Sequence, residues 1–221
     1  PIHSEDITEL SINNTVYPID IKNKNNEDIG ICVKGFNDQI QFIINELKRN
    51  PMSRRLVVSA WSPENAQKSK LPPCHCMFIL NVQFDQGQPI LCCHLTQRSC
   101  DIGLGVPYNI ASYALLTHII SILVNIPVGY FAHTLIDSHI YTKSADGSNA
   151  EYDHIPKLKE QITREPLSLP KLKIAQAAFD EAPWSLDDIT KLAETSTENI
   201  LDIFHLEGYN PHPAIKLKVA V

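Results

Sequence analysis

The sequence predicts a mixed α/β (α+β) fold in which one mixed sheet and its helices form a single layered domain. The chain has 221 residues, enough for one substantial core without demanding a second domain. Strand-like and helix-like segments are intermixed along it rather than gathered in separate halves. Hydrophobic residues make up 43% and charged residues 20% of the chain, which is typical of a globular protein and excludes disordered and collagen-like classes.

The N-terminal part is expected to be mostly loop, followed by one helix. Residues 1–35 are polar and weakly periodic, so at most a short strand over residues 15–21 is predicted. Asn50 and Pro51 end a helical pattern that covers residues 36–49. The apolar side chains of that pattern recur at spacings of three and four, at Ile40, Ile43, Ile44 and Leu47. An amphipathic surface helix is therefore predicted there.

Three strands are predicted in the middle of the chain. Residues 55–61 are rich in Val and Leu and indicate a strand. Residues 77–84 and 90–96 indicate two further strands, and the Asp-Gln-Gly-Gln sequence of residues 85–88 joins them. A hairpin follows from this arrangement.

The second half of the chain returns to helices. Residues 108–125 predict a long apolar helix, residues 132–141 a strand, and residues 152–165 a helix that Pro166 stops. The Asp-Gly-Ser-Asn sequence at 146–149 indicates an exposed turn.

Charge and cysteine content indicate which partners to expect. A net charge of −6 argues against a protein that coats DNA. The chain carries six cysteines, and its first residues lack a secretory pattern, so a reduced, cytoplasmic setting is expected. The apolar run 110–126 includes polar residues and is interpreted as a buried helix, not a membrane span.

Cys74 is the candidate nucleophile. It follows Pro72 and Pro73, a rigid approach that would present a thiol in a defined direction. A thiol attacks as the thiolate, and a nearby guanidinium such as that of Arg98 would stabilise the anion. The Cys-His-Cys run at 74–76 also raises the possibility of zinc, but structural zinc sites place two or more residues between paired ligands. No metal is therefore predicted.

Other polar residues suit a nucleotide. Arg54, Arg55, Arg98 and Ser99 stand at strand ends and offer three guanidiniums and a hydroxyl for a phosphate. The amide of Asn109 at the helix start can both donate to and accept from neighbouring groups on a pyrimidine edge. His139 and Tyr141 alternate on one strand face and could bind a sugar hydroxyl.

Taken in order, these segments resemble the thymidylate synthase family over residues 36–174 and 207–221. The shared pieces are Arg54-Arg55, Trp61, Leu71-Pro72-Pro73-Cys74-His75, Gln97-Arg98-Ser99 with Asp101, Leu104-Gly105-Val106-Pro107, the run from Asn109 to Thr117, His133-Thr134-Leu135, His139-Ile140-Tyr141 and the tail Gly208-Tyr209-Asn210-Pro211-His212-Pro213. The resemblance implies one domain over residues 1–221, with residues 1–35 a divergent or incomplete N-terminal part, and a homodimer formed through a face of the sheet.

The resemblance also implies an activity: methylation of deoxyuridine monophosphate (dUMP) with 5,10-methylenetetrahydrofolate, which supplies both a one-carbon unit and a hydride. Cys74 would add to C6 of uracil. Arg98 and Ser99 would bind the phosphate, and Arg54 and Arg55 would reach it from the partner subunit.

The remaining roles follow from the same resemblance. Cys100 and Asp101 would lie against the pyrimidine, Asn109 would read its edge, and His139 with Tyr141 would hold the ribose. Asp101 and Ala220 would contact the folate, with the tail closing over it.

Two other functions are compatible with the sequence. One is a nucleotide hydroxymethylase on the same fold, although relatives acting on cytosine prefer a carboxylate where Asn109 stands. The other is a catalytically incomplete nucleotide-binding relative, because the family's N-terminal glutamate is not identifiable in this sequence.

Overall fold

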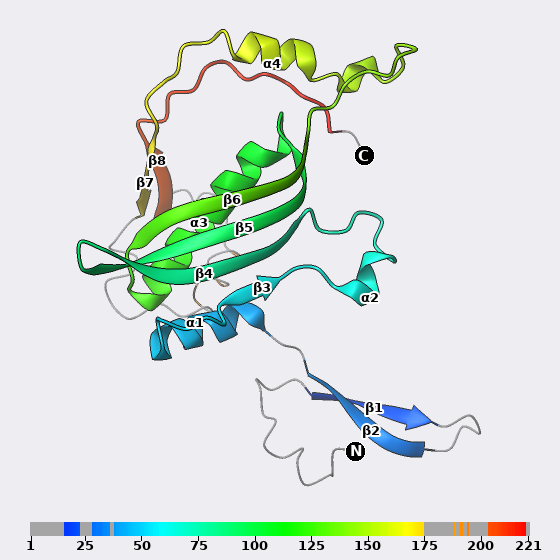
Figure 1. Ribbon diagram of the computed structural model, residues 1–221, viewed down its shortest axis with the longest axis vertical. Helices are drawn as coiled ribbons and strands as arrows, with labels where there is room; N and C mark the ends of the chain where they lie inside the picture. Colours follow the sequence, from blue (N-terminus) through cyan, green and yellow to red (C-terminus); the bar gives the residue numbers. More distant parts are fainter. Residues whose placement is uncertain are drawn as a thin grey trace.

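The computed structural model describes residues 16–22, 28–35, 38–174, 188, 191, 194 and 203–219, the first two ranges by their backbone alone. A four-stranded sheet in the order β3-β4-β5-β6 lies at its centre, with helix α3 behind it (Figure 1). The elements of this layer are α1 (Gln39–Arg49), β3 (Val57–Ser59), α2 (Pro63–Ala66), β4 (His75–Asp85), β5 (Gln88–Asp101), α3 (Gly105–Val124) and β6 (Val128–His139). The predicted mixed α/β class is confirmed.

The hairpin β4-β5 forms the middle of the sheet and is longer than predicted. Its turn uses Gln86 and Gly87, which both have positive φ angles, 48° and 83°. Two successive left-handed residues give a turn whose twist matches that of the flanking antiparallel strands. The pairing then continues from Asp85 opposite Gln88 back to His75 opposite Gln97.

The connection from β5 to β6 places α3 on one face of the sheet. β5 and β6 are parallel, so the chain must cross over between them, and α3 supplies that crossover. The core lies between the helix and the sheet and contains Ile43, Leu47, Leu56, Val58, Phe78, Leu80, Val82, Leu91, Cys93, Leu95, Ile120 and Ile126.

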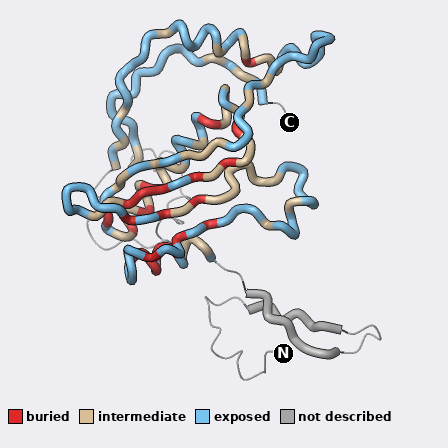
Figure 2. Tube along the Cα trace, in the orientation of Figure 1, coloured by how far each residue is buried: buried red, intermediate tan, exposed pale blue. Residues whose placement is uncertain are grey.

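The opposite face of the sheet is largely uncovered (Figure 2). We call it the open face and define it by Val57, Ile79, His94, Thr96, Arg98, Tyr130, Ala132, Thr134 and Ile136. These residues follow from the register, which aligns Val57 with Ile79, Ile79 with His94, and His94 with Ala132, and from the alternation of side chains along each strand. Tyr130 and Ile136 are 62% and 64% exposed. Exposed apolar side chains on an uncovered sheet face, here Val57, Tyr130 and Ile136, are typical of an interaction surface.

The C-terminal segments form a long arm beyond the sheet. α4 (Ile155–Gln161) leads into β7 (Lys171–Ile174), which pairs with β8 (Phe204–Glu207), and residues 209–219 then run back beside α4 (Figure 1). Arg164 donates to the Pro213 carbonyl at 2.6 Å, and a ring nitrogen of His212 lies 2.9 Å from the Glu165 carbonyl. We call residues 209–219 the tail.

Several boundaries differ from the prediction. The helix predicted over 152–165 consists of a short 3₁₀ turn at Ala150–Tyr152 and the separate helix α4, because Pro156 stands in the first turn of a new helix. The strand predicted over 55–61 shortens to β3, since the amides of Ala60 and Trp61 both turn to the Cys76 carbonyl. The predicted N-terminal strand is β1 (Val16–Lys22), and its partner β2 (Asp28–Gly35) was not predicted.

Helix α3 matches the apolar helix predicted over 108–125 and begins three residues earlier. By length and composition it could also cross a membrane, a test that core helices of soluble proteins pass as well. In this structure Val106, Thr117, Ile120 and Leu123 of α3 are buried against neighbouring elements. The exposed turn at 146–149 is present, with Gly147 at a φ of 80°.

Candidate active site

The sulfur of Cys74 lies beside the guanidinium of Arg98. Arg98 Nη2 is 3.9 Å from Cys74 Sγ, and the backbone amide of Arg98 donates to the Cys74 carbonyl at 2.8 Å. The same guanidinium donates through Nε to the Pro73 carbonyl at 3.0 Å and through Nη2 to the Pro72 carbonyl at 2.7 Å. The two prolines therefore hold Arg98 in place through their carbonyls, and the cation is close enough to stabilise a thiolate.

Trp61 completes this cluster at the open face. Its ring centroid lies 5.6 Å from Cζ of Arg98, a cation-π contact. Cys74 is partly buried, not sealed, so its sulfur remains reachable by a small molecule. Because Arg98 belongs to the open face, a molecule or second chain that bound this face would lie next to the guanidinium.

Gln97 organises a second polar cluster on the helix side of the sheet. Its side chain is 2% exposed. The Nε2 atom donates to the Ser99 carbonyl at 2.9 Å and to Oδ1 of Asn109 at 3.0 Å, while Oε1 lies 3.0 Å from Nε2 of His133.

The orientation of each amide in this cluster follows from one backbone group. The Ser99 carbonyl can only accept, so the nearby Gln97 atom must be the amide nitrogen. Asn109 must then present its oxygen to Gln97, and His133 must donate from Nε2 to the Gln97 oxygen. The amide nitrogen of Asn109 is left to donate elsewhere, which suits a carbonyl acceptor on a ligand.

Asp101 is held at the start of α3. Its Oδ1 accepts from the Gly103 amide at 3.0 Å and its Oδ2 from the Gly105 amide at 3.2 Å. The Gly105 amide is one of the unpaired donors that begin α3, whereas Gly103 lies in the turn before the helix. The carboxylate therefore ties this turn to the start of the helix. The side chain is 16% exposed, so a ligand can still contact it.

His139 and Tyr141 lie next to each other, although the strand predicted over 132–141 is β6 (Val128–His139) and Tyr141 follows its end. Their ring centroids are 5.2 Å apart in an edge-to-face arrangement. His139 also pairs with Asp101 across the β5-β6 ladder. The sugar-binding candidates and the candidate folate contact therefore share one end of the sheet.

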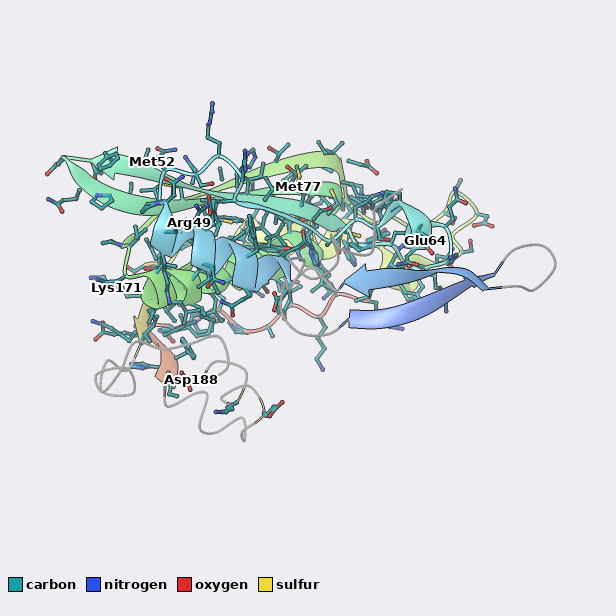
Figure 3. The ribbon with its side chains drawn as sticks, turned by 90° about the horizontal axis from the view of Figure 1, so that it is seen from below. Arg49, Met52, Glu64, Met77, Lys171 and Asp188 are labelled. Atoms are coloured by element: carbon teal, nitrogen blue, oxygen red, sulfur yellow. The ribbon has the colours of Figure 1, made fainter. Side chains whose placement is uncertain are left out.

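Arg54 and Arg55 lie away from this cluster, in the loop between α1 and β3. They help to line a hollow of about 390 Å³ together with Glu46, Arg49, Asn50, Met52 and Ser53. Figure 3 shows Arg49 and Met52 at the same end of α1. Within the described part of the chain, no contact of Arg98 involves either of these two arginines.

Glu46 supports the arginine-containing hollow. Its carboxylate is largely buried and accepts from Nε of Arg49 at 3.2 Å. That bond, together with a hydrogen bond from Ser53, holds the pKa of Glu46 below its ordinary value. The Ser53 hydroxyl in turn accepts from the Arg55 amide at 3.3 Å. The backbone before β3 is thus tied to α1.

The remaining predicted site residues occupy different environments. Ser99 pairs with Asp137 in the ladder. Cys100 is 0% exposed and burial raises the pKa of its thiol, so this residue presents no exposed surface to a ligand in this structure. Ala220 lies outside the described residues. Among the residues that the structure describes, no group of three or more His, Cys, Asp or Glu side chains could hold a metal ion.

Roles for Gln97, His133, His154 and Glu46 were not predicted from the sequence. Gln97 and His133 belong to motifs that resemble those of the thymidylate synthase family. That resemblance is the one sequence signal that could have pointed to a role for them. Glu46 falls at a helix position that reads as solvent-facing, and His154 precedes a short helix with no motif of its own.

Comparison with known proteins agrees with the geometry. A family model described as thymidylate synthase matches residues 10–221. The chain is similar to a thymidylate synthase of Saccharomyces cerevisiae, 44% identical over 189 residues that cover 83% of this chain and 54% of the yeast protein. It is similar to those of Candida albicans, 42% identical with 85% and 57% covered, and Listeria innocua, 44% identical with 83% and 49% covered. The chain thus spans about half the length of the curated relatives it matches.

Proposed function

The chain belongs to the thymidylate synthase family, and from that premise we propose that it methylates the uracil ring of dUMP, with 5,10-methylenetetrahydrofolate as the donor of the one-carbon unit and the hydride. The observation that carries the proposal is the approach of Arg98 Nη2 to within 3.9 Å of Cys74 Sγ. A positioned cation beside a partly exposed thiol is the arrangement that a covalent nucleophile requires.

Cys74 begins the proposed reaction. Its thiolate adds to C6 of uracil, a carbon-sulfur bond forms, and the electron pair of the C5-C6 double bond moves toward C5 and O4. The ring thereby gains an enolate-like carbon that can attack the one-carbon unit. The C5 hydrogen then leaves as a proton to a base. When a hydride reaches the one-carbon unit, the sulfur departs as thiolate with the electron pair of the carbon-sulfur bond, and the C5-C6 double bond is restored.

Asn109 stabilises the charge that this addition creates. The hydrogen-bond order set by the Ser99 carbonyl leaves the Asn109 amide nitrogen free to donate, and O4 of the ring is where negative charge develops. A donor that is already oriented strengthens its interaction as the charge builds up, so it favours the transition state over the ground state. The same donor disfavours cytosine, which has an amino group at that position.

The proposed phosphate site joins two copies of the chain. Arg98 and Ser99 supply one side, and Arg54 and Arg55 of a second copy supply the other, in a homodimer that buries the open face. Two features support this arrangement: Arg98 emerges on the open face, and Arg54 and Arg55 make no contact with Arg98 within one chain. Guanidinium groups bind phosphate oxygens in pairs and stay charged.

The residues present fit a folate next to Asp101. The carboxylate is anchored but still 16% exposed, and it can accept from the N–H groups of a pterin. Ile102 and Tyr108 next to it are 36% and 68% exposed and offer apolar surface to the cofactor's aromatic rings. Bound there, methylenetetrahydrofolate would supply the one-carbon unit and the hydride. His139 and Tyr141 would hold the ribose, and the tail would exclude water from the closed site.

The proposal is tested by trapping the covalent adduct. The protein is incubated with 5-fluoro-dUMP and methylenetetrahydrofolate, and the complex is analysed by denaturing mass spectrometry. We expect a ternary adduct on the peptide that contains Cys74. Cys76→Ser is the matched control, because this thiol is two residues away and only donates to the Thr96 carbonyl at 3.4 Å. Cys74→Ser must abolish the adduct and Cys76→Ser must retain it.

Product analysis separates the alternatives. Thymidylate and dihydrofolate support the synthase reaction, whereas a 5-hydroxymethyl product without dihydrofolate would replace it with the hydroxymethylase. Nucleotide binding measured by calorimetry, without tritium release from 5-tritiated dUMP, would identify a catalytically incomplete relative.

A further inference from the structure

His154 is a buried imidazole at the point where three segments meet. Its side chain is 1% exposed. Its backbone amide donates to the Tyr141 carbonyl at 3.0 Å, and the two rings make an edge-to-face contact at 5.5 Å. The turn before α3 approaches so closely that a Cβ at Gly103 would lie 2.7 Å from Nδ1 of His154. The ring is therefore held between the end of β6 and this turn.

The two ring nitrogens face different partners. Nε2 lies 2.8 Å from the Lys218 carbonyl in the tail. A carbonyl only accepts, so Nε2 carries the hydrogen. Nδ1 is buried without a hydrogen-bond partner in the described part of the chain, and lies 3.6 Å from Oδ1 of Asp101. One ring thus spans the gap between the backbone of the tail and the carboxylate beside the proposed folate site.

The turn that contacts the ring is the same turn that holds Asp101. Gly103 meets His154 on one side, and its amide donates to Asp101 Oδ1. Closely packed groups of this kind move together because there is no free volume to absorb a shift of one alone. A change in the ring's position therefore moves both the turn and the carboxylate.

We propose that His154 is a positioning residue that fastens the tail at Lys218 to the turn carrying Asp101, so that closure of the tail and orientation of the Asp101 carboxylate depend on each other. The kinetic consequence rests on the proposed function, whereas the mechanical coupling does not. Coupling between two sites is reciprocal: loosening the tail must loosen the turn, and the reverse.

The same tail residue offers a matched control. The Lys218 ammonium forms an ion pair with Glu151, and both side chains are more than half exposed, at 61% and 52%. Exposed ion pairs contribute little to stability. Glu151→Gln therefore removes a surface contact of Lys218 and leaves its buried carbonyl bound to His154.

The kinetic test compares His154→Asn with His154→Gln. The Gln amide nitrogen reaches the position of Nε2 and can donate to Lys218, whereas Asn ends near the position of Nδ1 and cannot. Loss of a buried hydrogen-bond partner predicts a rise of about tenfold in KM for methylenetetrahydrofolate in the Asn variant. We expect partial rescue by Gln, a smaller rise in KM for dUMP than for folate because the ring also contacts Tyr141, and no effect of Glu151→Gln. Equal losses for folate and dUMP, or no difference between Asn and Gln, would overturn the proposal.

Hydrogen exchange tests the coupling without turnover. In the unliganded protein, His154→Asn must accelerate amide exchange in both residues 101–105 and residues 209–219. A second variant approaches from the other side: a chain shortened to end at Leu217 lacks the Lys218 carbonyl and must accelerate exchange in residues 101–105. If His154→Asn accelerates exchange in only one of the two segments, or if the shortened chain leaves exchange in residues 101–105 unchanged, His154 does not couple the tail to the turn. If the wild-type protein fails to methylate dUMP, the proposed function is wrong, and exchange still decides the role of His154.

Discussion

Replacing Gln97 by a glutamate should reverse the polarity with which Asn109 faces the ligand. In the native structure one amide nitrogen donates both to the Ser99 carbonyl and to Asn109 Oδ1. An ionised carboxylate can only accept, so both contacts would become repulsive. His133, whose Nε2 already lies 3.0 Å from the Gln97 oxygen, would supply a charge-assisted donor. Asn109 relieves the clash by turning its nitrogen toward the introduced carboxylate and its oxygen toward the ligand.

The magnitude follows from the hydrogen bond that is lost. In the proposed reaction the Asn109 nitrogen donates to a ring oxygen that becomes negatively charged, and such bonds contribute about 1.5 to 3 kcal/mol. At about 1.4 kcal/mol for each factor of ten, kcat/KM for dUMP should fall by about 10- to 150-fold. The affinity for dCMP should rise at the same time, because its amino group now meets an acceptor.

The assay combines tritium release from 5-tritiated dUMP with calorimetric binding of dUMP and dCMP. Gln97→Leu is the control: it removes all three hydrogen bonds without imposing either orientation on Asn109, so dUMP activity should fall without a gain for dCMP. Circular dichroism and thermal unfolding check that each variant is folded. A Gln97→Glu protein that keeps dUMP activity within twofold and gains nothing for dCMP would show that Gln97 does not orient Asn109.

Three further changes test other parts of the structure. The Cys74→Ser variant and the Arg54→Ala/Arg55→Ala variant should each be inactive alone, and mixing them should restore part of the activity. In a mixed dimer, one of the two sites combines the intact thiol of one subunit with the intact arginines of the other. Continued inactivity of a verified mixed dimer would exclude a shared phosphate site. Burial, with a smaller effect of nearby His94, holds the pKa of His133 below its ordinary value. As the pH falls, the unfolded chain therefore binds a proton at this histidine before the folded protein does. The free energy of unfolding should decrease as the pH drops below about 6.5 and level off below the lowered pKa of the folded state. Urea unfolding at several pH values measures that slope, and NMR titration separates His133 from His118, whose pKa is also lowered by burial; a His133 ring that titrates at its ordinary pKa would contradict the reasoning. Glu46→Gln should raise KM for dUMP by less than Arg55→Ala does, because it disturbs only the support of the arginine loop; a larger effect than that of Arg55→Ala would mean that Glu46 acts directly on the ligand.

The sheet and helices were predictable because their signals are local. The hairpin turn at 85–88 and the apolar stretch at 108–125 each depend on a few neighbouring residues, and both elements are present. The strand β2 was missed because its polar flanks resemble loop, and it is defined by pairing with β1. The helix predicted over 152–165 is shorter in the structure because Pro156 stands in the first turn of α4, where its fixed φ suits the start of a new helix and not the middle of a longer one.

The candidate site also has a part that the sequence predicted and a part that depends on tertiary or quaternary structure. Cys74, Arg98, Asn109, His139 and Tyr141 were identified from their residue types and motifs, and the structure brings Cys74 to Arg98 and His139 to Tyr141. Arg54 and Arg55 were also identified, yet one chain leaves them apart from Arg98, and their role depends on the proposed second copy.

The sequence by itself determines the family of this protein, its mixed α/β class and the kinds of reactive group it carries: a thiol, guanidiniums and an amide in ordered motifs. The directions in which these groups act come from tertiary structure. Gln97 meets His133 across 36 residues and His154 meets Lys218 across 64, and a hydrogen bond between such distant residues leaves no periodic trace in a linear sequence. The folded sheet brings Gln97 to His133, and His154 to Lys218, within about 3 Å. Only these contacts decide which atom of Asn109 is left for a ligand and which segment holds the tail.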